Sequence, residues 1–207
     1  MPARVVCISR ETGAEGEEVG RLVAERLGLQ YVDEEVIARA AERAGVADEQ
    51  VADTEQRRSR IARVLEFLTD AGTGSGAIGP ETSALRAARE EGHRALIRSV
   101  VEEIADDGNA VIVAHAASMA LAGREGLLRV LVTASPETRI KRLAQTESNA
   151  DAARLVKDGD SARADYFKRF YDVEQELPTH YDVIVNTDAL SADQAAEVVV
   201  RAAKVSG

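Results

Sequence analysis

Aromatic residues, tryptophan, cysteine and proline are all scarce in this sequence, and each shortage restricts what the protein can be. Only 3% of the 207 residues are aromatic and none is tryptophan, so aliphatic side chains have to supply the core. Cys7 is the single cysteine, which excludes an intramolecular disulfide and metal clusters held by several thiolates. No apolar run approaches membrane-spanning length, and no basic-then-apolar leader precedes the first strand-like segment. We therefore expect a cytoplasmic protein.

Basic residues are also in short supply. The chain has 26 lysines and arginines against 36 acidic residues, a net charge of -10. Surfaces that bind nucleic acid or anionic membranes need a basic face, so we expect neither partner. A local basic pocket for a small phosphate compound stays open. With 45% apolar residues, the chain is long enough to bury a full core and short enough for one domain over residues 1–207.

Short apolar runs alternate with longer helical patterns along the chain. The strand-like runs lie at residues 5–9, 31–32, 110–114, 129–133 and 182–186. Ser135 with Pro136, and Ser191, are residue types that begin helices. This alternation indicates βαβ units, hence an α/β fold with a parallel sheet and helices on both faces. Such sheets bind ligands at the carboxyl ends of their strands. The residues at those ends in this sequence are Ser9, Arg10, His115, Thr133, Ala134, Asn186, Thr187 and Asp188.

Residues 33–107 are expected to form a helical insertion between the second and third strands. A glycine-rich segment at residues 71–80 (AGTGSGAIGP) interrupts the helical pattern, and we interpret it as a loop inside the domain. Its role stays open.

The first strand is followed by a glycine-bearing loop and a helix, with the sequence SRETGAEGEEVG at residues 9–20. Backbone N–H groups and the helix dipole at such a turn attract anions. The complete phosphate-loop pattern, G-x-x-x-x-G-K-S/T, adds a lysine for the outer phosphates and a hydroxyl for magnesium. This segment does not match it. An acidic helix N-terminus, in which Glu15, Glu17 and Glu18 only complement the dipole, also explains the local pattern.

Residues 8–33 (ISRETGAEGEEVGRLVAERLGLQYVD) resemble the opening of the cytidylate kinase-like family of P-loop nucleoside monophosphate kinases. Family members typically show an S-R-x-x-G-x-G-G-R-E-x-G pattern there. The resemblance continues over residues 109–142 and over residues 160–188 (DSARADYFKRFYDVEQELPTHYDVIVNTD). It implies a P-loop kinase-like fold, with residues 33–107 on the monophosphate side and a short lid within residues 145–180.

The resemblance also implies ATP and magnesium as cofactors and a nucleoside monophosphate, CMP or similar, as acceptor. The catalytic residues it implies are Arg10, Arg163 and Arg169, with Asp160 and Lys168 completing the lid. The nucleotide-binding residues it implies are Ser9, Gly13, Gly16, Arg139 and Arg142. Glu17 and Glu18, which depart from the family pattern, are added to this set because either could hold the magnesium ion. The acceptor-binding residues it implies are Asp33, Arg39 and His115. No residue is assigned as a metal ligand, and a homodimer stays open.

Departures from the family pattern put the activity in question. Gly16 stands where the phosphate-loop lysine belongs, Glu18 where the magnesium hydroxyl belongs, and Glu17 where the family carries arginine. Residues 114–117 read AHAA in place of a typical G-R-G-A, so another arginine is lost. Phosphoryl transfer depends on positioning and charge neutralisation, and one charge pair at about 4 Å is worth roughly 4 kcal/mol at an effective dielectric near 20. Either Arg10 or a magnesium ion held by Glu17 or Glu18 could restore the balance.

Three functions therefore stay open. The first is a nucleoside monophosphate kinase that uses Arg10 as its substitute cation. The second is a degenerate, non-catalytic protein that binds a nucleotide or serves as an interaction module. The third is a kinase for another small phosphate acceptor.

Overall fold

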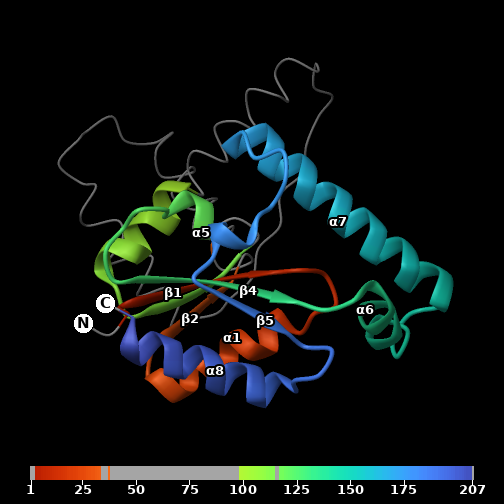
Figure 1. The fold of residues 1–207 in the computed structure, drawn as a ribbon, viewed down its shortest axis with the longest axis horizontal. Helices are drawn as coiled ribbons and strands as arrows, with labels where there is room; N and C mark the ends of the chain where they lie inside the picture. Colours follow the sequence, from red (N-terminus) through yellow and green to blue (C-terminus); the bar gives the residue numbers. More distant parts are fainter. Residues whose placement is uncertain (1–2, 34–36, 38–97, 115–116, 207) are drawn as a thin grey trace, which may run out of the picture. The chain divides into compact units, whose positions relative to one another are not determined.

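The computed structural model describes residues 3–33, 37, 98–114 and 117–206 (Figure 1). The chain divides into two compact units, one made of residues 1–33 with 107–207 and the other of residues 34–106. In the second unit the description covers Ile37 and the helical residues 98–106. Arg39, His115 and the glycine-rich segment at 71–80 lie outside the described residues.

The first unit is built on a sheet of five parallel strands. The strands are β1 (Val5–Arg10), β2 (Gln30–Asp33), β3 (Ala110–Val113), β4 (Leu127–Thr133) and β5 (Val183–Asn186). Their order across the sheet is β2-β3-β1-β4-β5, which places β1 at the centre. The predicted strands are confirmed to within about two residues; β4 begins earlier than expected, at Leu127.

Helices cover both faces of this sheet, as the sequence predicts (Figure 1). The described helices of this unit are α1 (Gly16–Leu27), α5 (Ala117–Ala120), α6 (Pro136–Leu143), α7 (Asn149–Tyr171) and α8 (Ala192–Val205). In Figure 1, α1 and α8 lie on one face, and α5 and α7 lie on the other. The one-turn helix α5 has no counterpart in the sequence-based prediction.

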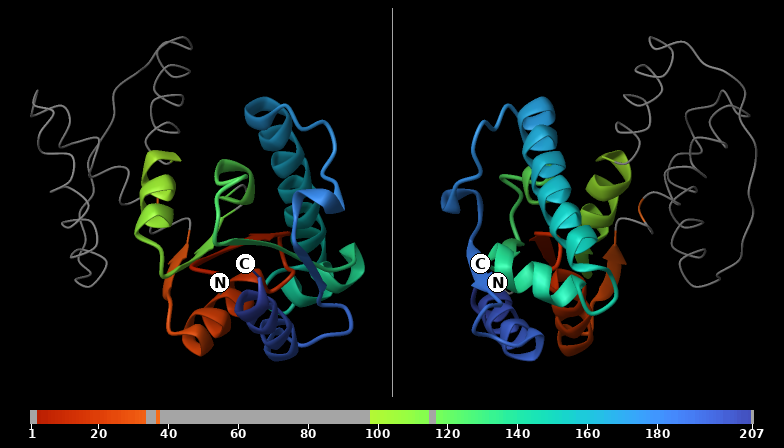
Figure 2. Two further views of the ribbon diagram at one scale, coloured as in Figure 1. Left: turned by 60° about the vertical axis from the view of Figure 1, so that its left-hand side comes forward. Right: turned by 90° about the vertical axis from the view of Figure 1, so that its right-hand side faces the viewer.

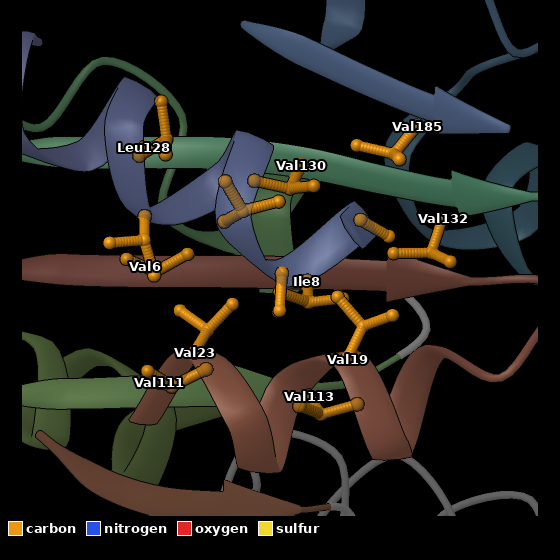
Figure 3. Packing of buried hydrophobic residues seen from close by; sticks show 14 of the residues in the cluster. Val6, Ile8, Val19, Val23, Val111, Val113, Leu128, Val130, Val132 and Val185 are labelled. Carbon is orange, nitrogen blue, oxygen red and sulfur yellow. The ribbon is translucent and has the colours of Figure 1, made fainter. Parts of the chain in front are cut away.

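The core between the sheet and the helices α1 and α8 is aliphatic, as the scarcity of aromatic residues requires. Val19 and Val23 of α1, one helical turn apart, point at the strands (Figure 3). The labelled residues that meet them are fully or almost fully buried: Val6, Ile8, Val111, Val113, Leu128, Val130, Val132 and Val185. Each buried valine or leucine contributes roughly 1.5–3 kcal/mol relative to an exposed one, so this layer holds the strand ends in fixed positions.

Helix ends in this unit follow local rules. Ser135 caps α6, with proline as the first helical residue, and Ser191 forms a capping box with Gln194 at the start of α8. Gly28 ends α1 in the left-handed conformation. The start of α1 is different, because its N-cap residue Glu15 has φ 63° and its side chain does not cap the helix.

The segment expected to contain the lid is dominated by α7, one continuous helix of 23 residues. Ser148 caps its start, and Asp172 ends it in the left-handed conformation. Both views of Figure 2 show α7 rising from the sheet on the face opposite α1 and α8. None of the helices in the described part of the chain is long and apolar enough to cross a membrane.

Candidate functional site

The loop between β1 and α1 follows the carboxyl end of the central strand. Ala14 N–H donates to Glu11 O at 3.0 Å and closes a turn within the loop. Among the described residues, the first N–H of α1 to bond a carbonyl is that of Val19, which donates to Glu15 O at 3.0 Å. The N–H groups of Gly16, Glu17 and Glu18 therefore precede the hydrogen-bond ladder of the helix. Their position at a helix N-terminus makes them donors for an anion.

The loop is held in place from outside through its carbonyl oxygens. Side chains of three other elements donate hydrogen bonds to them: Arg163 to Arg10 O at 3.1 Å, Arg139 to Thr12 O at 3.4 Å, Arg142 to Gly13 O at 3.4 Å and Thr187 to Ala14 O at 3.1 Å. The C=O and the following N–H of a trans peptide point in opposite directions. Drawing the carbonyls of Thr12 and Ala14 outward therefore turns the N–H groups of Gly13 and Glu15 to the opposite side of the loop.

Arg139 of α6 is the most buried of these arginines, with 3% of its surface exposed. Its two terminal nitrogens donate to the two carboxylate oxygens of Asp160 on α7, both at 2.8 Å. These hydrogen bonds raise the pKa of Arg139, so the guanidinium is charged at any physiological pH. Arg139 also lies directly against the loop, because a Cβ at Gly13 would be 3.0 Å from Arg139 O. Gly13 has φ 82° as well, so glycine is required there on two grounds.

Arg163 of α7 is immobilised by several partners. It donates to the two carboxylate oxygens of Glu176 at 2.8 and 2.5 Å and to Tyr181 Oη at 3.1 Å, and it lies 4.8 Å from the centre of the Phe167 ring. Tyr181 Oη also donates to Glu176. With 6% of its surface exposed, Arg163 works in this structure as a support for the loop at Arg10.

The lid residues implied by the resemblance are not all brought together. At about 100° per residue, Arg169 lies about 120° around α7 from Arg163. Its guanidinium lies 5.3 Å from the centre of the Phe170 ring. Lys168 is exposed and forms an ion pair with Glu174 at 2.8 Å. Arg163 thus contacts the loop, whereas no described contact joins Lys168 or Arg169 to it.

Two arginines at the loop are paired with the loop's own carboxylates. Arg10 Nε lies 2.7 Å from Glu17 Oε1, and Arg142 Nη2 lies 3.3 Å from Glu15 Oε2. These carboxylates are less buried than the arginines, with 42% of the Glu17 side chain and 40% of the Glu15 side chain exposed, against 17% for Arg10 and 22% for Arg142. Glu18, the next residue of α1, is exposed. On the side that faces solvent, the positive charges of Arg10 and Arg142 are therefore already neutralised by these two carboxylates.

Other expected site residues take different places. Ser9 is fully buried, and its hydroxyl lies 3.0 Å from that of Ser118, which belongs to the short helix α5. Asp33 ends β2 at the carboxyl edge of the sheet. Arg39 and His115 belong to the undescribed residues, so their roles stay predictions.

Several residues that shape the loop were given no role by sequence reasoning. Thr187 was placed only at the ligand-binding edge of the sheet, by its position directly after the last strand. It is almost fully buried, and its hydroxyl accepts from Arg142 at 3.0 Å while it contacts Ala14 O. Glu176 has no signal at all, because its partner Arg163 is 13 residues away on a different element. Glu11 accepts from Thr133 Oγ1 at 2.7 Å and so ties the loop to the end of β4.

The model of the cytidylate kinase-like family matches residues 5–189. The chain belongs to the cytidylate kinase-like family. No curated protein matches the sequence.

Solved structures show the same fold at low sequence identity. An uncharacterized protein from Eubacterium ventriosum is 14% identical, with 97% of this chain and 98% of that chain covered and a TM-score of 0.67. A shikimate kinase from Acinetobacter baumannii in complex with shikimate is 14% identical, with 97% and 92% covered and a TM-score of 0.51. A sugar kinase from Janibacter sp. is 14% identical, with 97% and 94% covered and a TM-score of 0.52. These likenesses establish a P-loop kinase-like fold for this family member.

Proposed function

We propose that this protein is a phosphotransferase that moves the terminal phosphoryl group of ATP to a nucleoside monophosphate, CMP or a similar compound. Family membership and the P-loop kinase-like fold support the reaction class. The observation that carries the proposal is the position of Arg10 over Gly16. A Cβ added to Gly16 would lie 2.4 Å from Arg10 Cβ, so Arg10 occupies the space where the phosphate-loop lysine would begin. Its guanidinium can bind two phosphate oxygens at once.

Charge around the loop argues for ATP in its magnesium complex. Four arginines of the site (10, 139, 142 and 163) face six carboxylates (11, 15, 17, 18, 160 and 176). A bare polyphosphate would meet an excess of negative charge here. Magnesium bound to the phosphates reverses that sign locally.

The carboxylates near the loop suit a metal ion that binds together with the nucleotide. Among the described residues, no group of three or more His, Cys, Asp or Glu side chains could hold a metal ion. Mg²⁺ in kinases is held by substrate phosphates, waters and one or two carboxylates, so a full protein cage is not required. Glu17 and Glu18, both in the first turn of α1, are the residues that would complete its coordination. The metal would neutralise charge on the phosphates.

Each residue at the loop would then have a role in binding or transfer that is set by its position. The N–H groups of Gly16, Glu17 and Glu18 would hold the donor's inner phosphates. Arg10 would leave Glu17 and bind the transferred group, lowering the barrier by neutralising charge that is spread over its oxygens. In the step itself, an acceptor phosphate oxygen bonds to the terminal phosphorus, and the bond from that phosphorus to the bridging oxygen breaks, releasing ADP.

A titration followed by a turnover assay tests this function. Purified protein is titrated by calorimetry with Mg–ATP and with CMP, and ADP release is then measured with both present. We expect binding of both and ADP release that requires CMP. Arg10→Gln should weaken Mg–ATP binding by about tenfold or more. Arg26→Gln is the control, because Arg26 is at the opposite end of α1, paired with Asp193 and Glu197.

A second candidate, a non-catalytic nucleotide-binding protein, is favoured by the neutralised arginines. Arg10 with Glu17 and Arg142 with Glu15 would let the loop hold its shape without a ligand. Saturable ATP binding with no ADP release, for CMP and for a panel of other nucleoside monophosphates, would support this candidate against the kinase. ADP release with a different phosphate-bearing or sugar-like acceptor would instead support a kinase of another small acceptor.

A further inference from the structure

Tyr31 of β2 has a buried hydroxyl group without a hydrogen-bond partner. In the part of the chain that the structure describes, no donor or acceptor pairs with the buried Tyr31 Oη. The large majority of buried side-chain polar atoms in proteins are paired, so this hydroxyl requires an explanation. The ring packs against α1: a Cβ on Gly20 would lie 3.2 Å from Tyr31 Cε2, and the Arg21 guanidinium lies 5.0 Å from the ring centre. A phenylalanine ring would make the same contacts, so packing does not account for the hydroxyl.

The surroundings of this hydroxyl include the first turn of α1. Tyr31 Cε2 is bonded to the carbon that carries Oη, so its closeness to Gly20 puts the hydroxyl end of the ring against the helix. Glu17 is three residues before Gly20, and residues three apart are neighbours on a helix surface. Burial raises the pKa of the Tyr31 phenol, and the Arg21 guanidinium lowers it. The carboxylates of Asp33 and Glu17 both raise it, so both charges act on the hydroxyl.

Glu17 is the carboxylate that can turn to this hydroxyl. It pairs with Arg10 at 2.7 Å, and 42% of its side chain is exposed, so it has room to change rotamer. In the proposed function Arg10 leaves Glu17 for the phosphates, and a carboxylate without its counter-ion would then stand beside a polyphosphate. Asp33, the other carboxylate that acts on the phenol, has contacts of its own in this structure. Glu17 therefore loses a partner at the same step in which Tyr31 can supply one.

We propose that Tyr31 is a positioning residue for the loop between β1 and α1, and that it takes the Glu17 carboxylate from Arg10 when ATP binds. The Tyr31 hydroxyl donates a hydrogen bond to one oxygen of Glu17, and the other oxygen stays available for a metal ion. Arg10 is thereby released to the phosphates. The exchange replaces an ion pair by a charge-assisted hydrogen bond and pairs a buried hydroxyl, so it offsets the loss of the ion pair on binding. This inference rests on the proposed function and adds the step that makes Arg10 available.

Urea unfolding tests the exchange without any nucleotide. Tyr31→Phe keeps the ring and removes the hydroxyl, so the urea midpoint of the otherwise wild-type protein should stay unchanged or rise. In Arg10→Gln, Glu17 has lost its counter-ion and should already accept from Tyr31. Addition of Tyr31→Phe to Arg10→Gln should then lower the midpoint by about 0.3–1 M. Arg26→Gln, at the other end of α1, is the matched background in which Tyr31→Phe should behave as in the wild type.

Calorimetric titration with Mg–ATP measures the effect of the exchange on binding. Tyr31→Phe should weaken Mg–ATP binding by about 3- to 30-fold, because the ion pair then breaks without compensation. In a Glu17→Ala background there is no ion pair to exchange, and the same substitution should change binding by less than about twofold. Glu18→Ala is the matched background, since Glu18 is the next residue of α1 and is exposed. There the full loss of affinity should remain.

The outcomes separate this inference from the proposed function. A lower urea midpoint for Tyr31→Phe alone would overturn the inference, because the hydroxyl would then be paired before nucleotide binds. An equal effect of Tyr31→Phe on Mg–ATP binding in the Glu17→Ala and Glu18→Ala backgrounds would overturn it too, and would leave the kinase intact. If Mg–ATP binds with the expected coupling but no nucleoside monophosphate causes ADP release, the inference is supported and the kinase is overturned. If Mg–ATP does not bind the wild-type protein, the kinase and the exchange are both overturned.

Discussion

The side chain of Arg10 fills the space beside the α-carbon of Gly16, so that a Cβ on residue 16 would lie 2.4 Å from Arg10 Cβ and 3.0 Å from Arg10 Cδ. The first of these contacts is with an atom close to the backbone, which cannot move away at low cost. Any residue with a Cβ at the end of β1 therefore excludes a lysine at position 16, the start of α1. The residue that stands at the end of β1 is itself a cation, Arg10.

Substitution of Gly16 tests this exclusion. Gly16→Ala should lower the free energy of unfolding by about 1–3 kcal/mol, because the added methyl overpacks the contact with Arg10. The double variant Arg10→Gly, Gly16→Ala, which removes the Cβ of residue 10, should recover a large part of that loss, giving a coupling energy above about 0.5 kcal/mol in urea-unfolding experiments. Gly16→Lys alone should not strengthen Mg–ATP binding. Additive effects of Arg10→Gly and Gly16→Ala would contradict the exclusion.

Removal of the Glu17 charge should release Arg10 for phosphate. We expect Glu17→Gln to tighten binding of magnesium-free ATP several-fold at low salt, since Glu17 lies 2.7 Å from Arg10 Nε and competes with phosphate for it. Glu18→Gln removes the same charge one residue later, from an exposed position, and should have a smaller effect. Calorimetric titrations of both variants at two salt concentrations make the comparison. Equal effects would mean that only net charge matters and that Arg10 does not meet the phosphates.

The ion pair between the buried Arg139 and the partly exposed Asp160 should be needed for both the fold and the loop. Asp160→Asn leaves the buried guanidinium without its main charged acceptor, at a cost of about 1–3 kcal/mol in the free energy of unfolding. Because Arg139 also donates to Thr12 O, nucleotide binding should weaken too. Asp158→Asn, two residues earlier on α7 and exposed, should change unfolding by less than about 0.5 kcal/mol. Similar losses in the two variants would contradict a special role for Asp160.

Local patterns in the sequence predicted the framework of this protein. Parallel strands that are buried on both faces produce continuous apolar runs such as VVCIS and AVIVA, and these can be recognised without knowledge of their neighbours. Helix starts at Ser135 and Ser191 depend on residues within one turn, so they were predicted as well. The position of the loop at the end of β1 follows from the same local reasoning.

The chemistry of the loop could not be obtained in this way. Arg139 and Arg163 were grouped with the residues that contact the nucleotide, but their partners Asp160 and Glu176 stand on other elements, 21 and 13 residues away. Only the folded structure shows that these arginines donate hydrogen bonds to backbone carbonyl oxygens at the loop. The left-handed conformation of Glu15 was equally hidden, because a glutamate gives no sequence signal for positive φ.

The ion pair between Arg129 and Asp182 gives a pH-dependent prediction. Hydrogen bonds from the Arg129 guanidinium hold the pKa of Asp182 below its usual range. The stability from this pair is therefore fully present above the unfolded-state pKa of about 3.9 and is lost as the pH falls through the lower folded-state pKa. Asp182→Asn should lower the free energy of unfolding by about 1 kcal/mol at pH 7, a modest loss because both side chains are partly exposed.

Urea unfolding at a series of pH values checks the sign of this effect. The difference between wild type and Asp182→Asn should stay constant from about pH 7 to pH 5 and shrink below about pH 4, as Asp182 of the wild type becomes protonated. A difference that keeps its full size at about pH 2 would show that the loss comes from packing and not from the charge.

The left-handed conformation of Glu15 should lower the free energy of unfolding, and a glycine at this position should raise it again. Glu15 has φ 63° at the N-cap of α1. In this conformation a residue with a Cβ is less stable than glycine by about 1–2 kcal/mol. Glycine loses about 0.5–1 kcal/mol of this advantage because its unfolded state is more flexible. Both Glu15→Gly and Glu15→Gln lose the contact with Arg142. The comparison between them therefore isolates the backbone, and Glu15→Gly should be more stable than Glu15→Gln by roughly 0.5–1 kcal/mol in urea unfolding. Because the two variants have the same charge, tighter Mg–ATP binding in Glu15→Gly alone would show that the loop must bend at residue 15 to receive phosphate. Equal stability of the two variants would mean that the left-handed conformation at residue 15 carries no net backbone strain.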